Sequence, residues 1–245
     1  MRIKLFYIFF FLSTFSLPQA FAQNYEAKLQ KADSLFFEKK YTNALSLYQE
    51  IHENSDQFSL QMLLKMAFIK EALGDYTSAL YYLNLYYNSN PNKKVLKKME
   101  DLASKYQLQG YRYTDLEYFI SLYNQYYYYI VFFFLACALT YYIYLVTKKV
   151  RRKKLGLRPL LFMIILGAAF GLTNFKIIPP KGIINTSGTY LMSAPSAASE
   201  PLVLLDKGHR VMILDKEDVW YQIRWEDKEA YVLESNLMMI GEGSK

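Results

Sequence analysis

The chain has 245 residues, of which 53% are hydrophobic and 21% are charged, and its formal net charge at pH 7 is +7. The apolar share exceeds the roughly 45–50% of soluble domains, so some apolar sequence is expected outside a globular core. One cysteine and two histidines exclude an internal disulfide and a Cys/His zinc site. The chain also lacks the phosphate-loop, dinucleotide, nucleophile-elbow and zinc-protease motifs, so we expect no enzyme and no catalytic, metal or cofactor site.

Residues 1–22 have the layout of a secretory signal peptide. Arg2 and Lys4 are followed by an apolar run over residues 5–12, and Ala20-Phe21-Ala22 supplies a small-x-small cleavage site. An uncleaved anchor helix is the alternative, although the apolar run is short for one. The sequence therefore predicts export of the region that begins at residue 23.

Two further apolar segments, 127–147 and 159–175, predict transmembrane helices. The first has 21 residues and would reach about 31 Å, the thickness of a bilayer core. The second has 17 residues and carries small residues suited to close helix packing, with a buried core helix as its alternative. Loop 148–158 between them holds seven basic residues and no acidic one, which predicts that it is cytoplasmic.

This topology predicts a two-pass bacterial inner-membrane protein with both folded domains in the periplasm. The basic loop accounts for much of the net charge, so its expected partner is anionic membrane lipid, and no nucleic-acid partner is expected. A nucleic-acid role for the loop is the alternative.

Residues 23–126 show helical periodicity and an internal repeat. Ala32 and Ala44 recur as Ala67 and Ala79 at an offset of 35 residues. Two helical hairpins with small residues at their crossings explain this pattern. The features shared with a known repeat are Ala67, Leu73-Gly74-Asp75-Tyr76, Ala79-Leu80, Leu83 and Pro91. In these the chain resembles the tetratricopeptide repeat (TPR) family, with repeats over about 25–56 and 60–91 and capping helices after them.

The TPR resemblance implies a binding groove lined by the first helix of each pair. Its candidate residues in this chain are Leu29, Asp33, Phe36, Phe37, Leu64, Phe68 and Glu71. An amphipathic helix or an extended apolar peptide is the expected ligand class. The alternative is that the three phenylalanines only pack between helices.

From residue 189 to 240 the pattern changes to short alternating runs, which predicts a small barrel of about five strands after a linker at 176–188 and before a tail at 241–245. The shared features are Ala194-Pro195-Ser196, Lys207-Gly208, Trp220-Tyr221, Ala230-Tyr231-Val232 and Ser235-Asn236-Leu237. The segment thereby resembles bacterial SH3-like (SH3b) domains. Candidate groove residues are the aromatics Tyr190, Trp220, Trp225 and Tyr231. The alternative places Trp220 in the core and Tyr231 half-buried.

The predicted fold class is thus a multidomain membrane protein with all-α TPR-like hairpins, two transmembrane helices and a C-terminal all-β SH3-like barrel. This combination resembles BatE-type proteins of the Bacteroides aerotolerance (Bat) operon family. That resemblance implies von Willebrand A domain membrane proteins and a MoxR-type ATPase system as partners. We expect a non-enzymatic scaffold, with an envelope sensor or wall anchor that binds peptidoglycan as the alternative.

Overall fold

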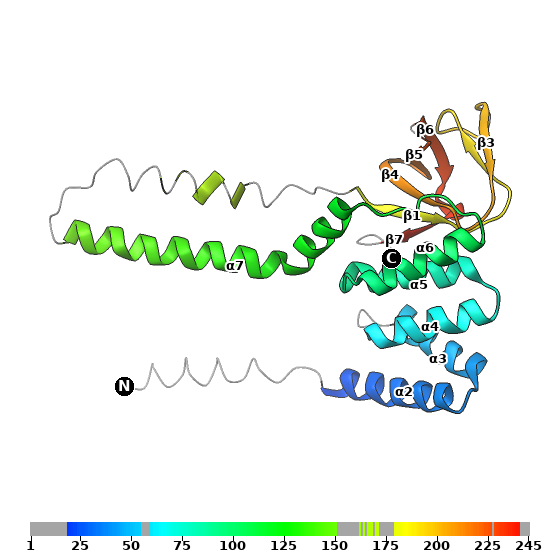
Figure 1. The fold of residues 1–245 in the computed structure, drawn as a ribbon, viewed down its shortest axis with the longest axis horizontal. Helices are drawn as coiled ribbons and strands as arrows, with labels where there is room; N and C mark the ends of the chain where they lie inside the picture. Colours follow the sequence, from blue (N-terminus) through cyan, green and yellow to red (C-terminus); the bar gives the residue numbers. More distant parts are fainter. Residues whose placement is uncertain are drawn as a thin grey trace. The chain divides into compact units, whose positions relative to one another are not determined.

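A computed structural model describes residues 19–54, 59–150, 162, 164, 166–168, 170–171, 179–226 and 228–240 (Figure 1). The chain divides into two compact units, Met1–Asp75 and Tyr76–Lys245, called here the N-terminal and C-terminal units. The predicted signal peptide, basic loop, second span and tail lie wholly or largely outside the described residues.

Over residues 19–54 and 59–75, the N-terminal unit contains helices α2 (Gln19–Phe37), α3 (Tyr41–Asn54) and α4 (Leu60–Ala72). Helix α3 contacts both α2 and α4. Ala32 on α2 and Ala44 on α3 are fully buried, as expected where small side chains let two helix backbones approach closely. The N-terminal region is therefore helical, as predicted.

One turn geometry recurs where three helices end. Lys39, Gly74 and Gln107 have left-handed φ values of +61°, +78° and +56°. In each turn this residue donates its N–H to the carbonyl three residues earlier, and the next residue donates to the carbonyl five residues before it at 2.8–2.9 Å. These bonds satisfy the last carbonyl groups of a helix. The three turns are spaced 35 and 33 residues apart, so the repeat seen in the sequence is also present in local backbone geometry.

The C-terminal unit begins with α5 (Tyr76–Ser89) and α6 (Lys93–Lys105), which contact each other. Asn92 caps α6 by accepting a hydrogen bond from the N–H of Lys94 at 2.8 Å. The buried face of α6 is apolar and consists of Val95, Leu96, Met99, Leu102 and Ala103. Lysines cover much of the opposite face, so this helix is strongly amphipathic.

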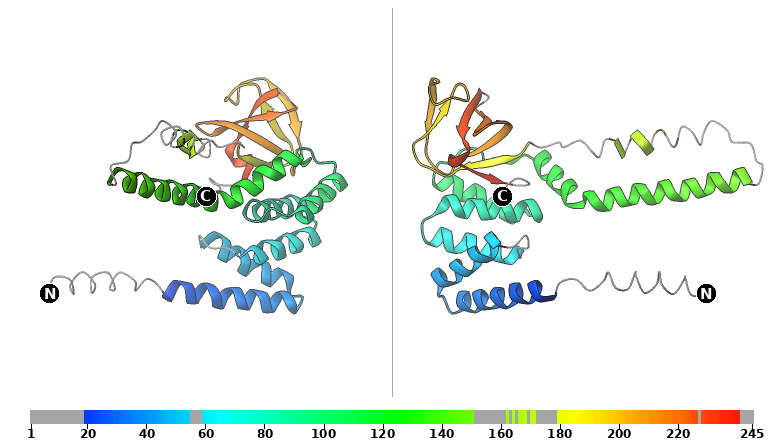
Figure 2. Two further views of the ribbon diagram at one scale, coloured as in Figure 1. Left: turned by 60° about the vertical axis from the view of Figure 1, so that its left-hand side comes forward. Right: turned by 180° about the vertical axis from the view of Figure 1, so that it is seen from behind.

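Helix α7 (Asp115–Val150) is a single continuous helix of 36 residues (Figure 2). Over Asp115–Lys148 it is long and apolar enough to cross a membrane, and no part of its most apolar stretch is buried. Within the part of the chain that the structure describes, α7 alone has this property. The first predicted span, 127–147, lies inside it.

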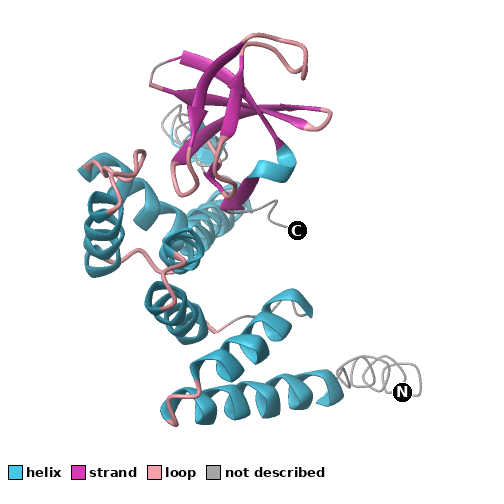
Figure 3. Cartoon of the chain, turned by 90° about the vertical axis from the view of Figure 1, so that its right-hand side faces the viewer, coloured by secondary structure: helices cyan, strands magenta, loops and turns pink. Residues whose placement is uncertain are grey.

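Seven strands follow in one antiparallel sheet (Figure 3). They are β1 (Lys181–Ile184), β2 (Thr189–Met192), β3 (Pro201–Leu205), β4 (Arg210–Glu217), β5 (Trp220–Trp225), β6 (Lys228–Leu233) and β7 (Leu237–Ile240), with a 3₁₀ turn at Glu234–Asn236. Their order is β3-β2-β6-β5-β4-β1-β7. Leu191, Ile223 and Val232 are fully buried in the hydrophobic core of the barrel. Strand β1 lies within the segment predicted to be a linker. These residues form a strand because they pair with both β4 and β7.

Candidate interaction sites

An aromatic patch lies on the N-terminal unit. The ring of Phe36 is 5.4 Å from Tyr41 and 5.9 Å from Phe68, and Phe37 stands edge-on to Phe36 at 6.1 Å. Phe37 and Phe68 are 75% and 51% exposed. Single exposed apolar side chains are common on protein surfaces, but a cluster of aromatic rings is typical of an interaction surface.

A charged group adjoins this patch. Asp33 on α2 accepts a hydrogen bond from Tyr48 at 2.6 Å and pairs with Lys65 Nζ at 2.7 Å. The same ammonium lies 5.6 and 5.3 Å from the ring centroids of Phe36 and Phe37. Burial, together with the Asp33 carboxylate, raises the pKa of Tyr48 well above its usual range. The patch therefore combines aromatic surface with a fixed ion pair.

Of the predicted groove residues, the structure brings together Asp33, Phe36, Phe37 and Phe68. The other three, Leu29, Leu64 and Glu71, are half-buried on α2 and α4. Sequence reasoning missed Lys65 and Tyr41. Lys65 lies three residues before Phe68 on one helix, and that spacing alone places the two side chains on the same face.

In the barrel the structure agrees with the alternative for Trp220 and Tyr231, and it corrects the exposure expected for Trp225. Trp220 and Trp225 are only 8% exposed. Tyr231 is half-buried, whereas Tyr190 is 57% exposed. Both tryptophans belong to β5, the strand between β4 and β6 in the sheet, but they are five residues apart and so point to opposite faces. Trp225 belongs to the buried core with Tyr221 and Ile223, whereas Trp220 is buried outside that cluster.

The exposed aromatic of the barrel belongs to the β2–β3 hairpin. Tyr190 pairs across the strands with Leu204, and Leu202 lies nearby on β3 at an irregularity of the pairing. All three side chains are exposed. The hairpin thus presents a small apolar surface. Among the described residues, β3 is an edge strand of the sheet.

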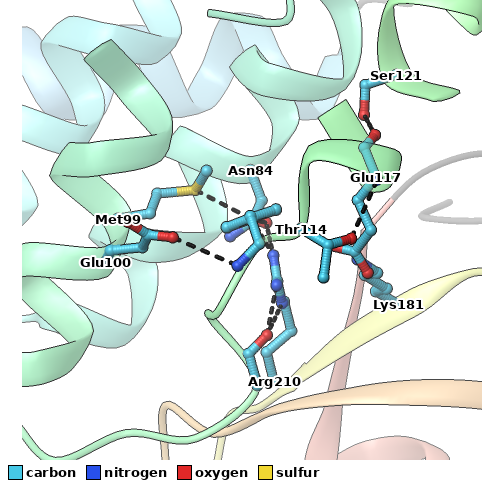
Figure 4. Close-up of polar contacts among 10 residues, drawn as sticks. Asn84, Met99, Glu100, Thr114, Glu117, Ser121, Lys181 and Arg210 are labelled. Atoms are coloured by element: carbon cyan, nitrogen blue, oxygen red, sulfur yellow. Dashed lines mark hydrogen bonds and ion pairs between the residues drawn. The ribbon is translucent and has the colours of Figure 1, made fainter. Parts of the chain in front are cut away.

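A polar cluster of the C-terminal unit surrounds Arg210, the first residue of β4 (Figure 4). This residue is 4% exposed. Arg210 Nε donates to the carbonyl oxygen of Gly110 at 2.7 Å, and Nη2 donates to the same oxygen. Nη1 donates to Asn84 Oδ1 at 3.0 Å and to the hydroxyl of Tyr113. One barrel side chain is thereby bonded to α5 and to the segment between α6 and α7.

Ring and backbone contacts extend this cluster. The guanidinium lies 4.8 Å from the centroid of Tyr111 and 4.3 Å from that of Tyr113. The Tyr111 hydroxyl donates to the Gly208 carbonyl at 2.8 Å, and Arg210 N–H donates to the Gln109 carbonyl at 3.1 Å. We call residues 108–113 with residues 208–210 the junction, because here the barrel is attached to the helices.

A second contact joins the barrel to the start of α7. Lys181 on β1 pairs with Glu117 Oε1 at 3.2 Å and lies 5.5 Å from the ring centroid of Tyr113. Burial and the nearby charge of Arg210 lower the pKa of Lys181, and Glu117 opposes this shift. The first turn of α7 and the first strand of the barrel are therefore neighbours.

The spacing of tyrosines in the sequence indicates one residue of the junction, Tyr111. Tyr41 and Tyr76 begin α3 and α5 at a spacing of 35 residues, and Tyr111 follows at the same spacing. At this third position no helix begins, and Tyr111 is instead buried against Arg210. The 35-residue spacing of tyrosines thus extends to the junction, although the helical hairpin does not.

Comparison with known families identifies part of this unit. Residues 187–238 match the bacterial SH3 domain. This SH3 domain includes β2 to β6 and part of β7, and β1 precedes the matched residues. Such a domain suggests a module for protein interaction or peptidoglycan binding. Among curated proteins, none matches the chain.

The burial of Tyr113 in the junction predicts that the free energy of unfolding falls at alkaline pH. Burial raises the pKa of Tyr113 to about 12 from an ordinary value of 10.0, while Arg210 opposes the rise. The unfolded chain therefore loses this proton first, and stability falls as the pH rises from about 10 to about 12, by roughly 1.4 kcal/mol per pH unit. In denaturant titrations across this range, Tyr113→Phe should fall less steeply than the parent. The exposed Tyr190→Phe should follow the parent, and equal slopes for all three proteins would contradict the prediction.

Proposed function

We propose that the protein is a non-enzymatic adaptor of the bacterial inner membrane that holds two interaction modules on the periplasmic side. The observation that carries this proposal is a match to an interaction-type domain in a chain whose long apolar helix has no buried residue in its most apolar stretch. An apolar helical surface of this length is stable in lipid and unfavourable in water. The helical region and the SH3 domain then lie on the same side of the membrane.

The N-terminal module is proposed to be a TPR-type array. The 35-residue repeat, the recurring left-handed turns and the buried alanines support this assignment. The three phenylalanines of the aromatic patch then occupy the first helices of the two repeats, α2 and α4, and Tyr41 begins the second helix of the first repeat. Its ligand is proposed to be an amphipathic helix or an extended apolar peptide, which would bury Phe37 and Phe68.

A second membrane crossing is proposed between α7 and the barrel. Helix α7 is about 54 Å long, and Lys181 pairs with Glu117 near its start. Val150 at the end of α7 and β1 near its start are therefore separated by about the length of the helix, as a second crossing requires. The ring of Phe162 lies 4.6 Å from that of Tyr141, which supports a return path close to α7. With the basic loop at 148–158 cytoplasmic, both folded regions become periplasmic.

The cellular setting is proposed from the resemblance in architecture to BatE-type proteins. In that setting the protein would belong to a stress or aerotolerance membrane complex with von Willebrand A domain proteins and a MoxR-type ATPase system. A chain that carries both an apolar patch and an SH3 domain is suited to hold two proteins together.

Crosslinking from outside the inner membrane tests the adaptor and its topology together. A membrane-impermeant amine crosslinker is applied to spheroplasts, and the products are identified by mass spectrometry. The expected products contain lysines of the helical region or the SH3 domain joined to another membrane protein. Labelling without any partner would contradict the adaptor role, whereas labelling only after lysis would contradict the topology.

The aromatic patch gives a mutational test. Combining Phe37→Ala with Phe68→Ala is expected to reduce recovery of the crosslinked partner at least about tenfold, since each aromatic anchor in an interface contributes on the order of 1–2 kcal/mol. The helical circular dichroism and the melting temperature of the variant should change little, because both rings are largely exposed.

Leu73→Ala is the matched control for this test, because Leu73 is also an exposed apolar residue of the N-terminal unit. It should leave partner recovery unchanged. Unfolding of the helical region by the double variant, with capture intact, would show that the two rings serve packing only.

Wall binding is the second candidate, favoured by the bacterial SH3 domain and the exposed Tyr190 on its hairpin. It is tested by sedimenting the detergent-solubilised full chain with purified peptidoglycan. Retention that Tyr190→Ala abolishes would favour a wall anchor or sensor over an adaptor. Without retention, the wall-binding function is excluded.

A further inference from the structure

The start of α6 carries a group of exposed lysines. Lys93, Lys94 and Lys97 are exposed, and the nearest acidic residues of the helix are Glu100 and Asp101. Glu100 already accepts a hydrogen bond from the N–H of Tyr113 at 3.3 Å. The N-terminal half of α6 therefore presents concentrated positive charge on its exposed face.

The first of these lysines lies beside the base of α7. Lys97 lies four residues after Lys93 and three after Lys94, so helical spacing places it next to both on α6. Lys93 Nζ is 5.0 Å from the ring centroid of Tyr118 on α7. Tyr118 precedes the expected bilayer core at residue 127 by nine residues, or about 13 Å of helix. The headgroup layer occupies roughly 5–8 Å of that distance, and the Debye length at physiological ionic strength is about 8 Å. The lysines are thus within electrostatic reach of lipid headgroups.

The exposed side chains of the first turns of α7 are also of the kind found at a membrane–water interface. Leu116 and Phe119 are 68% and 65% exposed and lie three residues apart on one helix face. Tyr126, Tyr128 and Tyr129 follow and are exposed as well. Lysines next to aromatic and aliphatic side chains are the composition of a membrane-surface segment, since the apolar groups enter the interface and the ammonium groups stay at the headgroups.

We propose that Lys93, Lys94 and Lys97 form a binding surface for the headgroups of anionic phospholipids in the leaflet from which α7 emerges. This surface seats the C-terminal unit on the bilayer and fixes the direction in which the SH3 domain faces. The inference rests on the proposed function to the extent that α7 spans the membrane. Lipid phosphate is the favoured occupant because α7 holds the lysines close to the bilayer at all times. The effective concentration of headgroups at this surface is therefore high.

The test compares the full-length protein in nanodiscs of phosphatidylcholine alone and in nanodiscs that also contain phosphatidylglycerol. Acylation rates of individual lysines by an amine-reactive reagent are measured by mass spectrometry. Lys93, Lys94 and Lys97 should react about threefold more slowly in the anionic discs, and high salt should remove the difference, since it screens the headgroup charge. Lys228, exposed in the barrel, serves as the internal control and should react equally in both discs.

A variant that combines Lys93→Gln, Lys94→Gln and Lys97→Gln gives the second readout. Native mass spectrometry from mixed micelles should show preferential retention of phosphatidylglycerol by the parent and its loss in the triple variant. Lys228→Gln is the matched charge control and should retain the lipid like the parent.

Equal acylation of the three lysines in both discs would overturn the proposal and leave the membrane assignment intact. An equal slowing of Lys228 would also overturn it, because the effect would then not be specific to α6. A chain that does not insert into nanodiscs would remove the proposal together with the spanning role of α7, so the two failures are distinguishable.

Discussion

Arg210→Ala is expected to destabilise the C-terminal unit by about 3 kcal/mol, because the substitution leaves the buried Asn84 Oδ1, the Gly110 carbonyl and the Tyr113 hydroxyl with fewer partners. The rings of Tyr111 and Tyr113 also lose the guanidinium between them. For a unit of this size the loss corresponds to a fall in melting temperature of roughly 6–12 °C.

The two tryptophans provide the measurement, since both are buried in the barrel and their fluorescence reports its unfolding. Arg224→Ala is the matched control, because Arg224 is an exposed residue on β5. A surface change of this kind should shift stability by no more than about 0.5 kcal/mol. Equal shifts for the two variants would show that the Arg210 cluster does not hold the barrel in place.

Gly110→Ala is expected to have a comparable or larger effect, of about 3 kcal/mol or more. Gly110 has φ +89°, and an added Cβ would overlap the carbonyl group of Arg210 on the barrel. Backbone atoms cannot move aside as the end of a flexible side chain can, so the junction would have to open. The expected result is a lower melting temperature and faster amide exchange in residues 108–113 and 208–210.

Gly188→Ala separates backbone strain from steric overlap. Gly188 also has a left-handed φ of +72°, but an added Cβ there would meet no atom within 4 Å. Its cost should be only the left-handed penalty of about 1–2 kcal/mol. If both alanine variants lose the same stability, the close approach of Gly110 to Arg210 is not an energetic constraint.

Together the junction contacts change the interpretation of the SH3 domain. The sequence predicts a barrel tethered through a linker at 176–188, yet β1 lies inside that segment and Lys181 pairs with Glu117 on α7. Arg210 attaches β4 to α5 and to residues 110–113. The barrel therefore behaves as part of the C-terminal unit, and a ligand of its exposed hairpin would act on a surface held next to the base of α7.

The sequence by itself determined the features that depend on local pattern. Helical periodicity predicts the helices of the N-terminal region, since each helix buries one face at 3.6-residue spacing. An uncharged apolar run predicts α7 as the long apolar helix, and turn residues between alternating runs predict the strands around Trp220–Trp225. In these cases the deciding interactions lie within a few residues of one another along the chain.

Tertiary structure alone decided the burial of Trp225, the strand at Lys181–Ile184 and the junction. Each of these depends on residues distant in sequence, and Arg210 and Gly110 are separated by 100 positions. A short run such as β1 becomes a strand only when β4 and β7 supply partners on both sides. Likewise Arg210 can be buried only because Asn84, Gly110 and Tyr113 accept hydrogen bonds from its guanidinium. These partners are far from Arg210 in sequence, so a local sequence pattern does not predict the contacts.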